Sequence, residues 1–287
     1  GGSGKRVCRF VVGTSTAGWT ADDCDYLCDG TADDVEINAA IQALPGTGGE
    51  VVILDGTYNI TATIAMNKDN VTLSGNGAAT VLKRMWNSSR DDGVITVVAS
   101  SGCCVKEVCV DGNNSSYNRS YNYGCSCRTS TKSIIINNIF INNYYGVYLI
   151  NSNEIIISNN TCINNSDSGI YMVGNNVKTV LYNIISENNC VENGTGITLK
   201  RVIGGLVTCN MVKENMTGIS IEVSDNCVVA SNIAIRGNGT PSEYSSDQYT
   251  IIADKNSANN LIIGNNIMGK NYVDGGTNNT WANNKYQ

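Results

Sequence analysis

Carboxylates, tyrosines, lysines and cysteines are the residues of this chain that could do chemistry, because none of its 287 residues is histidine. The absence of imidazole excludes a Ser-His-Asp triad, a Cys-His dyad and a histidine-ligated zinc site. Lysine and arginine number 19 and aspartate and glutamate 25, which gives a net charge of −6. A nucleic-acid partner requires a clustered basic face. The sequence has none, and we expect no nucleic-acid partner.

Two glutamates are the first catalytic candidates. Glu187 and Glu214 each stand four residues after an asparagine that recurs along the C-terminal half. On neighbouring coils they would lie one strand spacing apart, about 5 Å. That separation suits the acid and nucleophile of a retaining glycosidase, and it also suits a calcium ion, although we assign no metal or cofactor. The alternative is an exposed polar column in which Glu214 pairs with Arg236.

A second catalytic set combines Asp111, Asp167 and Lys200. Asp111 opens a long insertion, Asp167 lies in the turn before Gly169, and Lys200 shares an outward row with Arg128 and Glu222. A lysine beside carboxylates could serve a lyase or a hydrolase. Ordinary surface ion pairing is the alternative.

Tyrosines supply the candidate binding surface. The insertion at residues 111–124 is rich in tyrosine, and two later tyrosines each follow a glycine that opens a strand, which predicts stacked outward phenols. An aromatic plane beside hydrogen-bonding groups suits a sugar ring. A ladder that only stabilises the sheet is the alternative. The candidate ligand-binding residues are Tyr117, Arg119, Tyr121, Tyr123, Tyr148, Tyr171 and Glu222.

Repeated short strands must position these residues. From residue 133 onward, brief apolar runs recur, each followed by an asparagine; the aligned set is Asn138, Asn160, Asn183, Asn210, Asn232 and Asn266. In stacked parallel coils equivalent residues lie about 4.8 Å apart, so inward asparagine side chains can form a hydrogen-bonded ladder. A second column follows at Asn143, Asn165, Asn188, Asn215 and Asn271. The pattern predicts an all-β, single-stranded right-handed parallel β-helix of roughly ten coils, with Asn-ladder coils over 133–287.

The N-terminal half contains one helical pattern. Residues 33–44 carry an apolar stripe, with Asp33 as the predicted N-cap and Glu36 at the capping-box position. We expect this helix to cover the apolar end of the solenoid. Residues 1–6 have the composition of a linker or cloning scar, and residues 7–287 form the β-helix domain.

Residues 29–84 carry motifs that match a known superfamily. They contain Asp-Gly-Thr-x-Asp-Asp, Gly-Gly-x-Val-x-Ile, Gly-Thr-Tyr and Val-Thr-Leu-Ser-Gly-x-Gly. This series resembles the N-terminal signature of the pectate-lyase-like superfamily, whose members include polysaccharide lyases, glycoside hydrolases, epimerases, phage tailspikes and surface proteins. The resemblance implies contact with carbohydrate. The chain lacks the Gly-His-Gly of polygalacturonase-type members and, past Asp91 and Asp92, the acidic cluster that binds calcium in pectate lyases.

These features lead to one main functional hypothesis and two alternatives. The main one is recognition of a cell-surface polysaccharide by a spike or fibre of a phage tail, tailocin or cell surface. The alternatives are polysaccharide cleavage by carboxylates on the β-helix face, and a purely structural stalk. We expect an extracellular, virion or cell-surface location, attachment to a larger assembly through the N-terminus, and no membrane insertion, because no apolar run approaches the ~18 residues of a membrane span.

The C-terminal end and the cysteines leave further expectations. Trp281 and the final Tyr286-Gln287 offer no cap, which makes a homotrimer plausible. Most of the 12 cysteines fall at apolar strand positions, where a reduced thiol packs as a small hydrophobe. A disulfide from Cys8 to Cys24 or Cys28 is left open.

Overall fold

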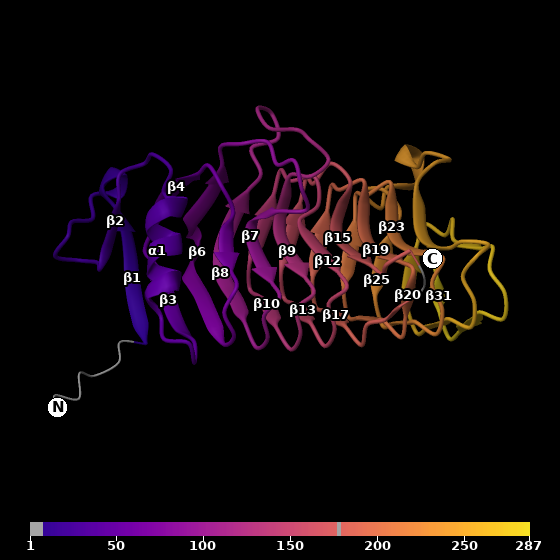
Figure 1. Cartoon of the computed structure of the whole chain (residues 1–287). Coiled ribbons are helices and arrows are strands. Elements are labelled where there is room, and N and C mark those ends of the chain that lie inside the picture. The colour runs from indigo at the N-terminus through magenta and orange to yellow at the C-terminus, as the bar shows by residue number, and fades with distance from the viewer. Residues whose placement is uncertain (1–7, 177–178) are drawn as a thin grey trace.

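The computed structural model describes residues 8–176 and 179–287, which form one elongated stack of parallel coils (Figure 1). One long face is a nine-stranded parallel sheet, here called the front sheet. The strands of the front sheet, in order, are β5 (Ile64–Met66), β7 (Gly93–Val98), β9 (Tyr123–Arg128), β12 (Val147–Ile150), β15 (Ser168–Val173), β19 (Thr195–Lys200), β23 (Thr217–Glu222), β26 (Tyr249–Ala253) and β29 (Val273–Asp274).

No helix in the described part of the chain is long and apolar enough to cross a membrane.

The other two faces are columns of three-residue strands that bend around a shared corner. One column is β10 (Ile134–Ile136), β13 (Ile156–Ser158), β17 (Ile184–Ser186), β21 (Leu206–Thr208), β24 (Val228–Ala230), β27 (Leu261–Ile263) and β30 (Thr280–Ala282). The other is β11 (Ile139–Ile141), β14 (Thr161–Ile163), β18 (Asn189–Val191), β22 (Met211–Lys213), β25 (Ile233–Ile235), β28 (Asn266–Met268) and β31 (Lys285–Tyr286).

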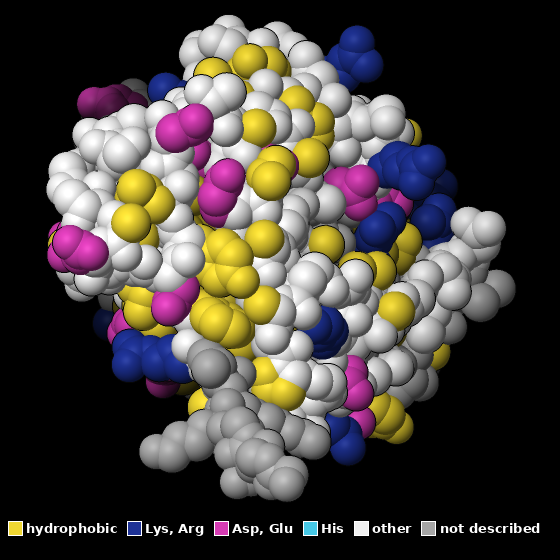
Figure 2. All heavy atoms as spheres, turned by 60° about the vertical axis from the view of Figure 1, so that its left-hand side comes forward, with side chains coloured by type: hydrophobic (Ala, Val, Ile, Leu, Met, Phe, Trp, Pro, Cys, Tyr) yellow, Lys and Arg dark blue, Asp and Glu magenta, His cyan; other side chains and the backbone are white. Residues whose placement is uncertain are grey.

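Longer strands and the helix build the N-terminal end. Helix α1 (Asp34–Ala43) contacts the first strands, and at this end hydrophobic side chains reach the surface only in small groups between polar atoms (Figure 2). The remaining elements are β1 (Arg9–Thr14), η1 (Ser15–Ala17), β2 (Tyr26–Cys28), β3 (Gly49–Ile53), β4 (Gly56–Ile60), β6 (Val71–Arg84), β8 (Cys104–Asp111), β16 (Thr179–Val180), β20 (Val202–Ile203) and η2 (Pro241–Glu243).

Each three-residue strand of the two columns contributes its middle side chain to the core, because successive side chains of a strand point to opposite faces. Ile135, Ile157 and Ile185 are fully buried and stack on one another through the register of β10, β13 and β17. After each of these strands the chain turns through a left-handed residue, at Asn137, Asn159 and then Glu187, with φ between 54° and 59°. Asparagine tolerates this conformation better than most residues, which accounts for part of its abundance.

An asparagine ladder joins the coils, as predicted, but two of its assigned members are wrong. Each ladder side chain after the first accepts from the backbone N–H and the side-chain amide of the asparagine one coil earlier, at 2.9–3.0 Å; the first, Asn138, accepts from the Val108 N–H at 3.2 Å. The members are Asn138, Asn160, Asn188, Asn210, Asn232, Asn265 and Asn284.

Asn183 and Asn266 are therefore not in this ladder. Asn183 lies at the corner before β17, where its side chain accepts from the Ile155 N–H at 2.7 Å and donates to the Ser152 carbonyl at 2.9 Å. Asn266 is the first residue of β28. The coil that contains Asn183 has extra residues, and these precede Asn183 instead of following it. The ladder position of this coil is therefore Asn188, five residues after the predicted one. The second ladder is correspondingly Asn143, Asn165, Asn193 and Asn215, without Asn188 or Asn271.

The helix is confirmed, but its predicted cap is wrong. Asp33 makes no side-chain bond to the helix; its carboxylate accepts from the backbone N–H groups of Gly30 (2.8 Å) and Asn59 (2.7 Å). The carboxylate therefore ties the helix to β4. All 12 cysteines, including Cys8, Cys24 and Cys28, are free thiols. The expected linker at residues 1–6 lies outside the described residues.

The Asn188 ladder bond predicts a large local effect on stability. Asn188 is 1% exposed and donates to Asn210, Ile157 and Ser186, so Asn188→Ala leaves several buried polar groups unpaired. We expect a loss of about 2–4 kcal/mol in the free energy of unfolding, measured by denaturant titration. The exposed neighbour Asn189 is the matched control, and Asn189→Ala should change it by less than about 0.5 kcal/mol. Equal effects of the two variants would contradict a special role for the ladder.

Candidate functional site

A cluster of tyrosines lies on the outer side of the front sheet. Tyr148 of β12 and Tyr171 of β15 occupy equivalent positions on adjacent coils, as predicted, and their rings stack with centroids 5.9 Å apart at 16°. Tyr123, at the start of β9, packs against Tyr148 with centroids 4.4 Å apart. Parallel pairing thus converts a sequence repeat into an aromatic surface.

The cluster also contains two tyrosines that the sequence reasoning missed. Tyr145 stacks on Tyr171 with centroids 4.4 Å apart at 20°, and Tyr144 packs edge-on against Tyr145 at 4.7 Å. The Tyr144 hydroxyl donates to the carboxylate of Asp167 at 3.1 Å. Two adjacent tyrosines directly before Gly146 were a usable signal, because the turn that precedes an outward strand must cover the same face.

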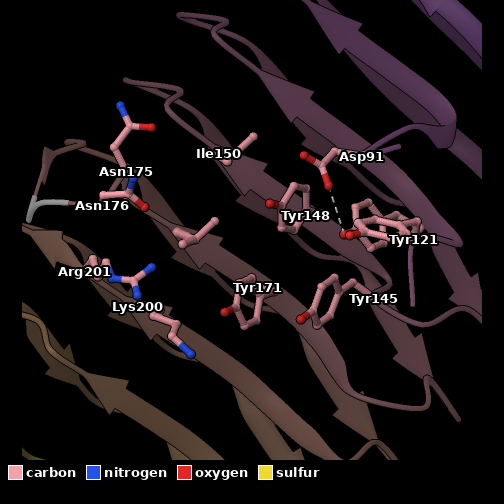
Figure 3. A pocket seen from close by; sticks show the side chains of 13 residues that line it. Asp91, Tyr121, Tyr145, Tyr148, Ile150, Tyr171, Asn175, Asn176, Lys200 and Arg201 are labelled. Carbon is pink, nitrogen blue, oxygen red and sulfur yellow. Dashed lines mark hydrogen bonds between the residues drawn. The ribbon is translucent and has the colours of Figure 1, made fainter. Parts of the chain in front are cut away.

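The tyrosines form the floor and one wall of an open cleft of about 380 Å³ (Figure 3). Tyr121 and Asp91 lie at one side, and the Tyr123 hydroxyl donates to Asp91 at 3.3 Å. Lys200 and Arg201 lie at the opposite side, near Asn175 and Asn176. A ring-sized ligand in this cleft would meet an aromatic plane flanked by polar and charged groups.

A second hollow of about 380 Å³ adjoins the cleft and shares Asp91 and Ile150 with it. Arg128, Thr129 and Asn151 also line it. The Arg128 Nε and the Asn151 Oδ1 are buried and have no hydrogen-bond partner among the described residues. A buried polar atom without a hydrogen-bond partner lowers the stability of the fold.

The row predicted to hold Arg128, Lys200 and Glu222 is confirmed. The register runs Val98, Arg128, Ile150, Val173, Lys200, Glu222 across successive coils. Both cations are ion-paired: Arg128 with Asp92 at 2.9 Å and Lys200 with Glu222 at 3.2 Å. The middle of the row, between these pairs, is apolar.

A buried arginine fixes the tyrosine side of the cleft. Arg84 is completely buried; it donates to the Tyr123 carbonyl at 2.6 Å and to the Asn122 side chain at 3.3 Å, and it stacks over Trp86 at 3.9 Å. The same Asn122 oxygen accepts from the Ser88 N–H at 2.8 Å. Arg84 therefore joins the insertion at residues 111–124 to the segment that carries Asp91. Burial lowers the pKa of its guanidinium to about 9, which leaves it protonated at neutral pH.

The predicted Glu187–Glu214 pair does not form. Glu187 follows β17 at the corner of the first asparagine ladder, whereas Glu214 follows β22 at the next corner. The residue equivalent to Glu214 on the preceding coil is Glu192, because Val191 pairs with Lys213. Glu214 is 3.8 Å from Lys213, and Arg236 instead lies over the Tyr244 ring at 4.8 Å. The register shift that misplaced Asn183 also misplaced Glu187.

The second catalytic set is likewise separated. Asp111 ends β8, pairs in register with Ile141, and accepts from the Asn142 side chain at 3.1 Å, away from the front sheet. Asp167 borders the tyrosines through Tyr144, and only Lys200 of the three lines the cleft. Of the insertion residues, Tyr121 and Tyr123 line the cleft, while Tyr117 and Arg119 do not.

Protonation favours hydrogen-bond donation over base chemistry in the cleft. Burial raises the pKa of Tyr123, Tyr145 and Tyr148 well above the usual value for tyrosine. Burial alone would lower the pKa of Lys200, but its interactions with Tyr171 and with the Glu222 carboxylate raise it overall. These groups stay protonated at neutral pH and would act as donors to a ligand.

One cluster outside the cleft has donors that a metal could use. The Cys28 thiol and carboxylate oxygens of Asp33 and Glu36 lie within 4.8 Å of one another near the start of α1. However, burial raises the pKa of the Cys28 thiol, and Asp33 already accepts two backbone N–H bonds. The cluster therefore fits an anchor for the helix better than a metal site, since metal binding requires the thiolate.

The stacked parallel coils define a right-handed β-helix protein. Residues 124–286 match the family described as the right handed beta helix region, and the chain belongs to this family. No curated protein matches the chain.

Several solved structures share the fold at low identity. ORF18 of Geobacillus virus E2 is 17% identical with a TM-score of 0.61, covering 96% of this chain and 60% of that one. The Dettilon tailspike protein is 17% identical with a TM-score of 0.53, covering 89% and 63%. Endo-xylogalacturonan hydrolase from Aspergillus tubingensis is 14% identical with a TM-score of 0.59, covering 90% of each chain. The chain thus spans less than two thirds of the first two proteins. Together with the family match, these similarities confirm the right-handed parallel β-helix fold.

The raised tyrosine pKa values predict alkaline destabilisation. An unfolded tyrosine ionises near pH 10, whereas Tyr123, Tyr145 and Tyr148 remain protonated in the folded chain at that pH. The stability that this difference provides is complete below about pH 10 and is lost as the pH rises further. The free energy of unfolding should therefore be constant across neutral pH, begin to fall near pH 9 as buried cysteines such as Cys28 and Cys109 contribute in the same way, and fall more steeply above pH 10. Tyrosinate absorbance should show at least three tyrosines titrating only as the fold is lost; free titration of every tyrosine near pH 10 would contradict their burial.

Proposed function

We propose that this chain is a glycan-recognition module that binds a polysaccharide on the tyrosine cleft of its front sheet. The observation that carries the proposal is the stack of Tyr123, Tyr145, Tyr148 and Tyr171 at the floor of an open cleft. Sugar rings pack on aromatic planes and use their hydroxyls to satisfy surrounding polar groups. The adjoining hollow is lined by Arg128, Thr129 and Asn151, whose side chains carry hydrogen-bonding groups.

The carboxylate count in the cleft supports binding over cleavage. A glycosidase of the usual kind needs two carboxyl groups flanking the scissile bond. Asp91 is the single carboxylate among the described residues that line the cleft, and its neighbour Tyr123 donates to it; the nearby Asp92 and Glu222 are held in ion pairs with Arg128 and Lys200. The protonated tyrosines and Lys200 supply no base for a lyase. Release of new reducing ends or unsaturated products from a bound polysaccharide would instead support the cleavage alternative.

The setting that we propose is a spike or fibre on a virion or cell surface. A rigid solenoid with its binding face along one side suits a protein that contacts a polymeric surface. ORF18 of Geobacillus virus E2 and the Dettilon tailspike protein share the fold, and both are longer than this chain. Attachment to a larger assembly and trimer formation belong to the same proposal; size-exclusion chromatography with light scattering tests the trimer.

Removal of one exposed cleft tyrosine tests the proposed function. Tyr145 and Tyr171 are partly exposed, and each alanine substitution removes an aromatic plane from the cleft. We expect binding to a polysaccharide array to weaken at least about tenfold, as for a truncated interface anchor. Tyr182→Ala is the matched control, because Tyr182 is 69% exposed and lies outside the cleft. Wild-type chain that binds nothing on a multivalent array, or an equal loss in the Tyr182 variant, would refute the cleft as the binding site.

A further inference from the structure

The cleft and the adjoining hollow are parts of one groove that runs along the solenoid. They share Asp91 and Ile150, and the row from Val98 to Lys200 forms a continuous base beneath them, with Glu222 next along the row. Successive positions on this row lie on successive coils, about 4.8 Å apart. An extended ligand could therefore lie parallel to the solenoid axis. It would meet an ion pair at Arg128, the apolar Ile150 and Val173, and a second ion pair at Lys200.

Each cation on this row is already matched by a carboxylate. Arg128 contacts Asp92 at 2.9 Å, with the two side chains 30% and 25% exposed. Lys200 contacts Glu222 at 3.2 Å, with exposures of 33% and 34%. The Ser220 hydroxyl donates to the other Glu222 oxygen at 3.1 Å and holds the carboxylate in place. Both pairs are a quarter to a third exposed, so a ligand can reach them without the pairs being broken.

The charge around the groove is balanced. Among the described residues, the cations that line it are Arg128, Lys200 and Arg201. Asp91 is the one carboxylate among these lining residues; Asp92 and Glu222 lie outside the lining and offset Arg128 and Lys200 through ion pairs, so that Arg201 and Asp91 are the charges outside these pairs. The whole chain carries −6. Along the row, a carboxylate-bearing polymer would therefore meet cations that already have carboxylate partners, and the field of the whole chain would oppose its approach.

We propose that this groove selects neutral glycans over carboxylate-bearing ones, and that Asp92 and Glu222 set this selectivity. The inference rests on the proposed function and names its ligand class. Sugar hydroxyls can donate to Asp92 and Glu222 and accept from Arg128 and Lys200 while both ion pairs remain intact. At Arg128 and Lys200 a ligand carboxylate must instead displace a protein carboxylate or lie next to it, and this repulsion is what discriminates against it.

Removing the carboxylate that pairs with one of these cations should shift the preference from neutral towards carboxylate-bearing glycans. Glu222→Gln keeps the size of the side chain but removes the charge that neutralises Lys200, and Asp92→Asn does the same for Arg128. The probe is an array on which each neutral polysaccharide is printed beside its own counterpart with primary hydroxyls oxidised to carboxylates. Wild-type chain should bind the neutral member of a pair more tightly. Each variant should shift the affinity ratio towards the oxidised member by about tenfold, the scale of one hydrogen bond to a charged group.

A control variant separates local pairing from net charge. Glu192→Gln makes the same charge change at an exposed corner outside the groove, and it should leave the ratio unchanged. Wild-type preference for the oxidised members, or identical ratios in the Glu222, Asp92 and Glu192 variants, would overturn the selectivity while leaving glycan binding intact. Absence of binding to every polysaccharide would refute the proposed function itself, and with it this inference.

Discussion

Parallel stacking of coils one strand spacing apart is the constraint on which the rest of this structure depends. Every residue has an equivalent on the next coil about 4.8 Å away, so each choice of side chain must be compatible with a copy of itself or with a complement. Asparagines satisfy one another at the inner corners, isoleucines fill the interior, tyrosines stack on the front sheet, and Lys200 meets Glu222. The core, the candidate site and its electrostatics are consequences of one spacing.

The same constraint explains which parts of the fold could be predicted. Coil repetition, the covering helix and the stacked pair Tyr148–Tyr171 were predictable, because they depend on spacing within one turn. The register of the coil before β17 was not. Asn183 precedes the short apolar strand β17 and Asn188 follows it. Both side chains accept from buried backbone N–H groups, so the local sequence pattern does not distinguish them. Only the position of the extra residues decides, and that depends on the pairing of β17 with β13.

The site shows the same boundary between local and non-local information. Glu187 and Glu214 were paired by a count of residues, and one slipped coil moved them to different corners. Arg84 and Asp91 were not found, because they reach the cleft through contacts to Tyr123 from segments more than 30 residues away in the chain. No repeat connects them to the tyrosines. A candidate supported by several coils in register is therefore more secure than one that depends on a single coil of unusual length.

Ion pairing across coils also bears on whether the groove could do chemistry. A reactive lysine or carboxylate needs a pKa near neutrality, and a cation next to its own carboxylate is held in the charged form. Lys200 is held in this way by Glu222 and by the Tyr171 ring system beside it. The stacking that makes the front sheet a regular and rigid surface thus neutralises its cations in pairs. This pairing of charges fits the glycan recognition that we propose, in which a polymer is bound by aromatic contact and by hydrogen bonds to its hydroxyls.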